Sequence, residues 1–142
     1  MNADPAHRFT VRVYYEDTDF SGVVYHASYL RFMERARTEY LRELGIHQQS
    51  IFDGSHGEAF GFAVRRMEID FMKPARMDDL LDVTTSPANI GGASIDLVQQ
   101  VMRGEDLLIA ARVRIACVTN GRPARLPVWV RNKMTKGLRP GP

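Results

Sequence analysis

The spacing of apolar and polar residues changes period twice along this chain. From residue 9 to residue 15 apolar residues alternate with polar ones, which predicts a β-strand. From residue 27 to residue 44 apolar residues recur every three or four positions, which predicts an amphipathic helix of about five turns. The apolar stripe of this helix consists of Tyr29, Met33, Ala36, Tyr40 and Leu44, widened by Leu30 and Leu41.

Four further strand-like runs follow the helix, at the spacing of an antiparallel meander. They cover residues 60–71, 81–85, 95–101 and 107–117. In the first run the alternation changes phase at Arg65-Arg66, which predicts a β-bulge that curves the strand. Pro87 is expected to end the second run, and Asn120-Gly121 is expected to form a turn with positive φ.

One strand, one long helix and four strands in succession contain no alternation of strands with helices. This order favours an α+β fold, in which a curved antiparallel sheet wraps around a single helix and each buries the apolar face of the other. Gly45 follows the helix at the position where a left-handed residue often ends one. Residues 46–61 form the connection, with room for a short helical turn.

Charge is distributed unevenly over the 142 residues. Residues 1–106 contain all 17 acidic side chains and 11 of the 19 Lys and Arg, a balance of −6, whereas residues 107–142 contain eight basic side chains and no acid. The basic part is either a solvated tail or an anion-binding surface for a phosphorylated ligand. It matches no nucleic-acid-binding motif, so a nucleic-acid partner is not expected.

Several classes of protein and of catalytic site are excluded or disfavoured. The apolar run from residue 107 to residue 118 is interrupted by two arginines and cannot span a bilayer, and the first eight residues have no apolar segment of a secretory signal. Cys117 is the single cysteine, so we expect a buried thiol and a cytoplasmic protein. The four histidines lack metal-ligand spacing, and no Gly-x-Ser-x-Gly elbow is present. A carboxylate mechanism remains.

The most informative segment runs from Arg12 to Tyr29. It contains Arg12-Val13, Asp17-Thr18-Asp19, Gly22-Val23-Val24 and Ala27-Ser28-Tyr29, and it leads from a strand through an acidic turn into the helix. This order can hold Asp19 beside the first amides of a helix, an arrangement suited to acyl transfer. The segment, together with Glu34-Arg35-Ala36-Arg37, Ile69-Asp70-Phe71 and Lys73-Pro74-Ala75, resembles the 4-hydroxybenzoyl-CoA thioesterase family of hotdog-fold enzymes, and most closely its Tol-Pal-associated acyl-CoA thioesterases.

The resemblance implies one hotdog domain over residues 1–142, with a core at about 9–130 and a basic tail at about 131–142. It implies an acyl-CoA thioesterase without a cofactor or metal, with acyl carrier protein as an alternative thiol carrier. The protein would be a homodimer or homotetramer with its active site between subunits. Among the residues that match the family's motif, Asp19 is the implied nucleophile or general base and the backbone N–H of His26 the implied oxyanion donor. Tyr14 and the His26 side chain would lie near the thioester, and Gly22, Tyr25, Lys73 and Arg76 would contact the substrate.

Each of these residues also has a simpler interpretation. Asp17 is expected to be a structural acid of the turn, and Tyr14 could equally be a core aromatic. The His26 side chain could be solvated or cap the helix. Glu34 could act as a catalytic carboxylate on the helix, but an ion pair with a neighbouring arginine at helical spacing is preferred.

The chain departs from the aryl-CoA members of the family at the basic cluster, near the third and fourth strands, that holds the CoA phosphates in those enzymes. Residues 89–94 carry no charge, so Lys73, Arg76, Arg103 and the basic C-terminal third are the candidates for that role. This departure also weakens the case for an aromatic acyl group. Two other functions remain open: a hotdog-fold hydratase or dehydratase, and a non-catalytic module that binds acyl thioesters or proteins.

Overall fold

The computed structural model describes residues 6–55, 57 and 59–136. Strand β1 (His7–Arg12) leads through the short 3-10 turn η1 (Tyr15–Asp17) to the long helix α1 (His26–Glu43), which the short helix α2 (Gln48–Phe52) follows. Four long strands come next, β2 (Gly61–Phe71), β3 (Leu80–Ile90), β4 (Ser94–Arg103) and β5 (Asp106–Thr119). The two-residue strand β6 (Arg122–Pro123) and helix α3 (Val128–Thr135) complete the described chain.

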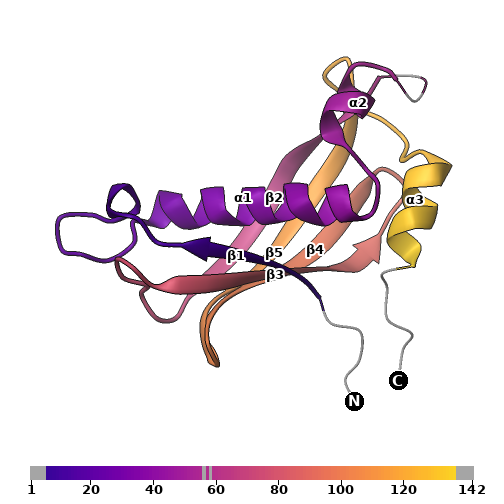
Figure 1. Ribbon diagram of the computed structural model, residues 1–142. Coiled ribbons are helices and arrows are strands. Elements are labelled where there is room, and N and C mark those ends of the chain that lie inside the picture. Colours follow the sequence, from indigo (N-terminus) through magenta and orange to yellow (C-terminus); the bar gives the residue numbers. More distant parts are fainter. Residues whose placement is uncertain (1–5, 56, 58, 137–142) are drawn as a thin grey trace, which may run out of the picture.

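The strands form one antiparallel sheet in the order β1-β3-β4-β5-β2, with β6 paired to β5. The sheet curves around α1, which lies along its concave face, while α2 and α3 lie beyond the C-terminal end of α1 (Figure 1). The expected α+β arrangement, a curved antiparallel sheet around one long helix, is therefore confirmed.

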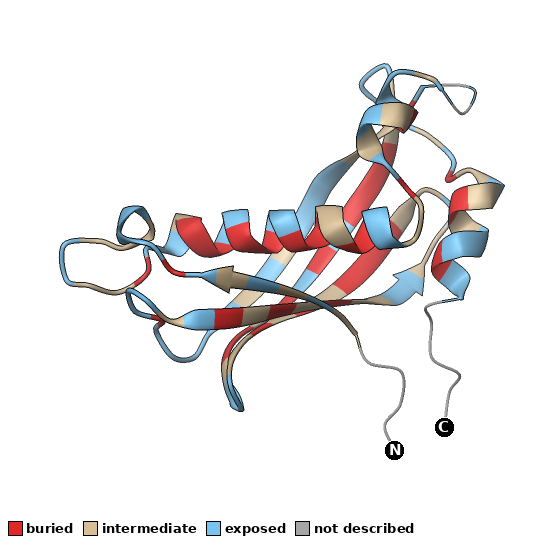
Figure 2. Ribbon diagram, in the orientation of Figure 1, coloured by how far each residue is buried: buried red, intermediate tan, exposed pale blue. Residues whose placement is uncertain are grey.

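Helix α1 buries one face against the sheet. In Figure 2 its buried residues, coloured red, gather on the side of the helix that faces the sheet. The buried apolar residues of this face are Tyr29, Phe32, Met33, Ala36, Tyr40 and Leu41. Most of the expected stripe is thus confirmed, but Leu30 is 41% exposed and does not belong to it. With 18 residues, α1 is about 27 Å long and separates two ends of the molecule.

The expected irregularities of the strands are partly confirmed. The register of β2 against β5 shifts between Val64 and Arg66, where the change of phase predicts a bulge. The expectation that Pro87 ends a strand is wrong, because β3 continues to Ile90 with a register shift just after the proline. Among the described residues, pairing of β1 with β3 ends at Thr85, so the missing N–H of Pro87 disrupts no described ladder on that side.

The turns behave as their residues predict. Gly45 has a φ of 83° directly after α1, and Asn120 and Gly121 have φ values of 52° and 75° between β5 and β6. Positive φ values are accessible to glycine at little cost and to asparagine more readily than to most residues. These residues therefore end the long helix and turn the chain after the last long strand.

Helix α3 includes residues 131–135 of the segment expected to form a basic tail. Val130 and Met134 of this helix are fully buried, and the Arg131 guanidinium donates a hydrogen bond to the carbonyl oxygen of Gly91. The first part of that segment therefore packs on the sheet, whereas residues 137–142 lie outside the described residues. None of the helices in the described chain has the length and apolar character needed to cross a bilayer.

Candidate functional site

The loop between η1 and α1 carries Asp19 in a tight turn. The Gly22 amide donates to the carbonyl oxygen of Asp19 across 3.1 Å, and the Asp19 amide donates to that of Val23 across 2.9 Å. Gly22 has a φ of 86°, which a side chain would disfavour. The acidic turn closed by Gly22 is thus present as expected.

The Asp19 carboxylate is held by Ser21. Its Oδ1 accepts hydrogen bonds from the Ser21 hydroxyl at 2.6 Å and from the Ser21 amide at 2.8 Å. The hydroxyl bond, followed by the amide bond, favours the charged form and lowers the pKa of Asp19 below its ordinary value. The side chain is therefore an oriented, ionised carboxylate at neutral pH.

The same loop is fixed to α1 and to the segment after β2. The Tyr25 amide donates to the Asp17 carbonyl oxygen, and the Val24 amide donates to that of Ala75, both across 2.9 Å. A backbone bridge pairs Val23 with Arg76. These contacts tie the turn that bears Asp19 to the start of the helix.

Helix α1 begins at His26, after Tyr25 as N-cap residue. The Tyr25 side chain makes no capping hydrogen bond, and its carbonyl oxygen accepts from the Ser28 amide at 2.9 Å. The amides of His26 and Ala27 come before that bond, at the positive end of the helix dipole. A helix start of this kind can stabilise negative charge on an oxygen atom of a ligand.

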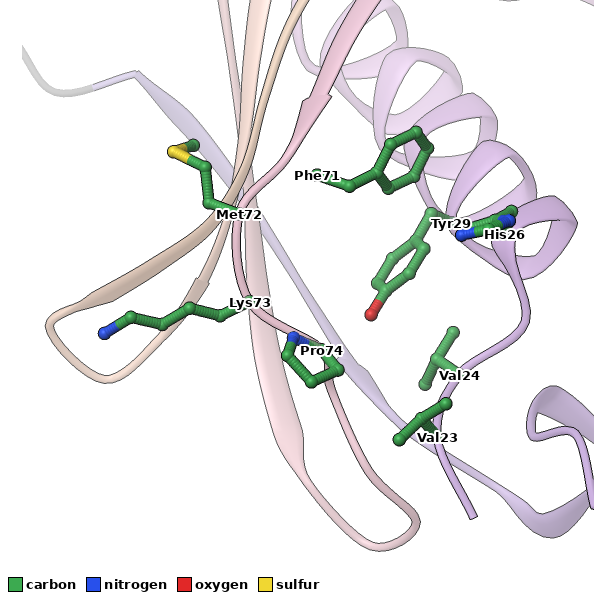
Figure 3. A pocket seen from close by; sticks show the side chains of 8 residues that line it. All are labelled: Val23, Val24, His26, Tyr29, Phe71, Met72, Lys73 and Pro74. Carbon is green, nitrogen blue, oxygen red and sulfur yellow. The ribbon is translucent and has the colours of Figure 1, made fainter. Parts of the chain in front are cut away.

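A cleft of about 210 Å³ lies beside this helix start. Eight residues line it: Val23, Val24, His26, Tyr29, Phe71, Met72, Lys73 and Pro74. Figure 3 shows Tyr29 between α1 and the segment after β2, with the Lys73 side chain extending away from it. The Tyr29 hydroxyl oxygen accepts a hydrogen bond from the Ala75 amide at 2.8 Å, and burial raises the pKa of this phenol.

Some of the expected site residues line the cleft, whereas others lie outside its lining. His26 lines it and is exposed, as the solvated alternative expects, and its ring packs against Phe71 with centroids 4.9 Å apart. Tyr14 and Tyr25 are 62% and 57% exposed, so Tyr14 is not a core aromatic. Asp19 is absent from the lining and lies in the same loop, four residues before Val23, which belongs to the lining.

The two other candidate carboxylates have different surroundings. Asp17 Oδ2 accepts a hydrogen bond from the Tyr14 amide at 2.8 Å, which agrees with a structural acid of the turn. Glu34 lies on the exposed side of α1. Arg37, one of its expected ion-pair partners, is buried, and its guanidinium donates to Gln99 Oε1 across 3.0 Å. Burial lowers the pKa of Arg37, and the negative charge of Glu34 opposes that shift, which agrees with an electrostatic pairing of the two.

Of the two basic residues expected to contact the substrate, Lys73 pairs with an acidic side chain through its ammonium group, and Arg76 contacts one through its main-chain amide. Lys73 Nζ lies 3.4 Å from Asp106 Oδ1, so a phosphate would have to compete with this carboxylate. Arg76 is exposed, and its amide donates to Asp79 Oδ2 across 2.9 Å.

The cleft residues Tyr29 and Phe71 were missed as site residues, because the sequence marks them only as apolar positions of a helix and a strand.

Comparison with known proteins agrees with this geometry. Residues 21–110 match the family described as the thioesterase superfamily. The acyl-CoA thioesterase YbgC of Haemophilus influenzae is 45% identical over 130 residues, which cover 90% of this chain and 93% of that protein. The acyl-CoA thioester hydrolase YbgC of Escherichia coli is 43% identical over 123 residues, which cover 84% and 89%.

A solved structure extends the comparison to three dimensions. The crystal structure of a probable thioesterase from Bartonella henselae has 46% sequence identity and a TM-score of 0.83, and the match covers 86% of this chain and 99% of that one. The family match, the relatives and this structure agree on both the fold and the class of enzyme. The chain therefore belongs to the thioesterase superfamily, which confirms the expected hotdog fold and the expectation of a thioesterase enzyme.

Proposed function

We propose that this protein hydrolyses acyl-CoA thioesters to CoA and a free carboxylic acid. The observation that carries the proposal is the position of the cleft at the first turn of α1, beside the loop that holds Asp19. Its relatives named as acyl-CoA thioesterases, similar over 84–90% of the chain, support the same activity. The finer grouping with Tol-Pal-associated enzymes, acyl carrier protein as a second thiol carrier, and a cytoplasmic location belong to this proposal.

In the proposed reaction Asp19 acts on the thioester carbon. The carboxylate either attacks this carbon and displaces the CoA thiolate, giving a mixed anhydride that water then hydrolyses, or removes a proton from the water that attacks. Support comes from the Ser21 hydrogen bonds, which favour the charged form that both routes need. The amide of His26 would donate to the developing oxyanion, assisted by the helix dipole.

The substrate contacts follow from the surface around the cleft. Gly22 lets the loop approach the thioester without a side chain, since its Cβ position has no neighbouring atom within 4 Å. Tyr14, Tyr25 and the His26 side chain would border the reacting group. Arg76 and Lys73 would meet the CoA phosphates, with Lys73 exchanging Asp106 for phosphate.

The proposed enzyme is a homodimer or homotetramer whose subunits share the active site. Within the described residues, strand β2 forms one edge of the sheet and pairs only with β5. Val64 and Phe71 of this strand are both 48% exposed, and Phe71 also lines the cleft. A second protomer on this edge would pair the free strand, cover apolar side chains and close the cleft.

Replacement of Asp19 by Asn tests the proposal, with thiol release from a panel of acyl-CoA esters as the measurement. We expect kcat to fall by about 10²–10⁴-fold, because Asn keeps the shape but neither attacks nor accepts a proton. Asp53→Asn is a matched control: Asp53 Oδ1 accepts the same pair of bonds from Ser55, at 2.5 and 3.0 Å, but beyond α2. If folded Asp19→Asn keeps the parental kcat, the assignment of Asp19 is rejected. If the parental protein releases thiol from none of the esters, the protein is a binding module and not a hydrolase.

A further inference from the structure

Arg103 lies at the end of β4, yet its guanidinium faces the segment that leads from β2 to β3. Its Nη1 donates to the Pro74 carbonyl oxygen at 3.2 Å and to Asp79 Oδ2 at 2.9 Å. Its Nη2 lies 3.8 Å from Asp106 Oδ2. One side chain thus joins the β4–β5 hairpin to both ends of a loop distant in sequence.

Asp79 completes the connection. Its Oδ2, which accepts from Arg103, also accepts from the Arg76 amide at 2.9 Å. Partial burial would raise the pKa of Asp79, but the bonds from the Arg76 amide and Arg103 outweigh this effect and lower it. Both side chains are partly buried, Arg103 at 33% exposure and Asp79 at 24%, so they form a less solvated pair than a surface ion pair.

The segment that this pair holds forms a wall of the cleft. Pro74 lines the cleft, and the adjacent Ala75 bonds in two directions: its carbonyl oxygen accepts from Val24 and its amide donates to the Tyr29 hydroxyl oxygen. Arg76 then pairs with Val23, whose carbonyl oxygen accepts from the Asp19 amide. A continuous set of bonds therefore links the guanidinium to the loop of the carboxylate and to the first turns of α1.

We propose that Arg103 is a positioning residue of the hydrolase, which sets the place of the Asp19 turn relative to the start of α1 by fixing the Pro74–Arg76 wall. Arg103 does not touch the substrate in this role. This assignment replaces the role of Arg103 as a candidate for binding a CoA phosphate, because its Nη1 already donates to Pro74 and Asp79 and its Nη2 lies near the Asp106 carboxylate. The kinetic part of the inference rests on the proposed function, whereas the structural part does not.

Arg103→Gln is the test variant, and Arg114→Gln is its matched control. Like Arg103, Arg114 is an arginine that donates hydrogen bonds to an aspartate. It links β5 to Asp96 of β4 through two bonds of 2.8 and 3.1 Å, but neither residue lines the cleft. The measurements are kcat and KM for acyl-CoA hydrolysis and amide hydrogen exchange by mass spectrometry. Arg103→Lys, which keeps one charged donor, is the conservative variant.

In Arg103→Gln we expect kcat to fall about tenfold, KM to change less than twofold, and exchange to accelerate at Val24 and Ala75. Arg103→Lys should recover part of kcat, and Arg114→Gln should keep parental kcat and parental exchange at these two amides. Unchanged exchange in Arg103→Gln, an equal loss of kcat in Arg114→Gln, or a rise in KM alone would overturn the proposal. If exchange accelerates but the parental protein hydrolyses no acyl-CoA, the proposed function fails and the structural role of Arg103 remains.

Discussion

The carboxylate of Asp19 accepts two hydrogen bonds from Ser21, one from its hydroxyl at 2.6 Å and one from its amide at 2.8 Å. Both of these bonds reach the same oxygen, Oδ1. The two bonds also favour the ionised carboxylate, so the pKa of Asp19 lies below that of an ordinary aspartate. The turn therefore orients the proposed catalytic group and keeps it charged.

The first prediction follows from that shift. Ser21→Ala removes the hydroxyl bond and leaves the amide bond, so the pKa of Asp19 should rise toward its ordinary value. Because the proposed mechanism requires the charged form of Asp19, the acid limb of kcat/KM should move to higher pH, while the rate at neutral pH should fall only modestly. Rates measured from about pH 3 to about pH 7, with fluorescence as a check on folding, would show this. If the acid limb stays at the parental pH, the ionisation of Asp19 is not its cause.

The second prediction concerns the main-chain amide of His26, the first residue of α1. Proline is favourable at this position of a helix, and Tyr25 before it has φ of −71° and ψ of 143°, an extended conformation that precedes proline well. His26→Pro should therefore keep the helix start but remove the N–H. If this N–H stabilises the oxyanion, kcat should fall by roughly 10²–10³-fold.

His26→Ala is the control for this variant. It removes the same imidazole, including its contact with Phe71, and keeps the amide. We expect a loss of less than about tenfold in kcat, well below the loss from a missing oxyanion donor. Equal kcat in the two variants, with circular dichroism confirming intact helix, would show that the amide takes no part in catalysis.

The sequence predicts the features of this fold that depend on local chemistry. Gly45 ends α1 with positive φ, the change of phase at Arg65-Arg66 becomes a bulge, and Cys117 is 1% exposed with its pKa raised by burial. Each of these follows from the residue itself or from its near neighbours. The acidic turn and the helix that follows it could be predicted for the same reason, because both depend on residues that are close together in the sequence.

The cleft itself could not be predicted, because it depends on contacts between distant segments. Val23 pairs with Arg76, and Tyr29 accepts a bond from Ala75, only because the end of β2 returns to the start of α1. Helix α3 was missed for another reason: only Val130 and Met134 among its eight residues are buried, which leaves little apolar periodicity to detect.

The third prediction concerns a polar network inside the core. Gln99 is fully buried on β4; its Oε1 accepts from Arg37, and its Nε2 donates to the Met33 carbonyl oxygen and to Thr85 Oγ1, each across 3.0 Å. Arg37 is only 8% exposed. Gln99→Leu should lower the free energy of unfolding by about 3 kcal/mol, because a buried guanidinium loses an acceptor.

Thr85→Val provides the comparison, since it removes one neutral acceptor of the same amide and should cost about 1 kcal/mol. Urea unfolding of both variants, followed by circular dichroism, measures the difference. A loss in Gln99→Leu no greater than that in Thr85→Val would mean that Arg37 finds another acceptor or reaches water.

The fourth prediction addresses assembly through the free edge of β2. Val64→Glu places a charge on this edge at a side chain that is 48% exposed, and it should prevent a second protomer from packing there. The parental protein should have at least twice the protomer mass of 16.1 kDa by light scattering, and the variant should have the protomer mass. Its kcat should fall as well, since the proposed active site lies between subunits. Val128→Glu, at a 70% exposed position of α3, should remain assembled. A parental protein that is monomeric and fully active would contradict the shared site, because one protomer would then suffice to close the cleft.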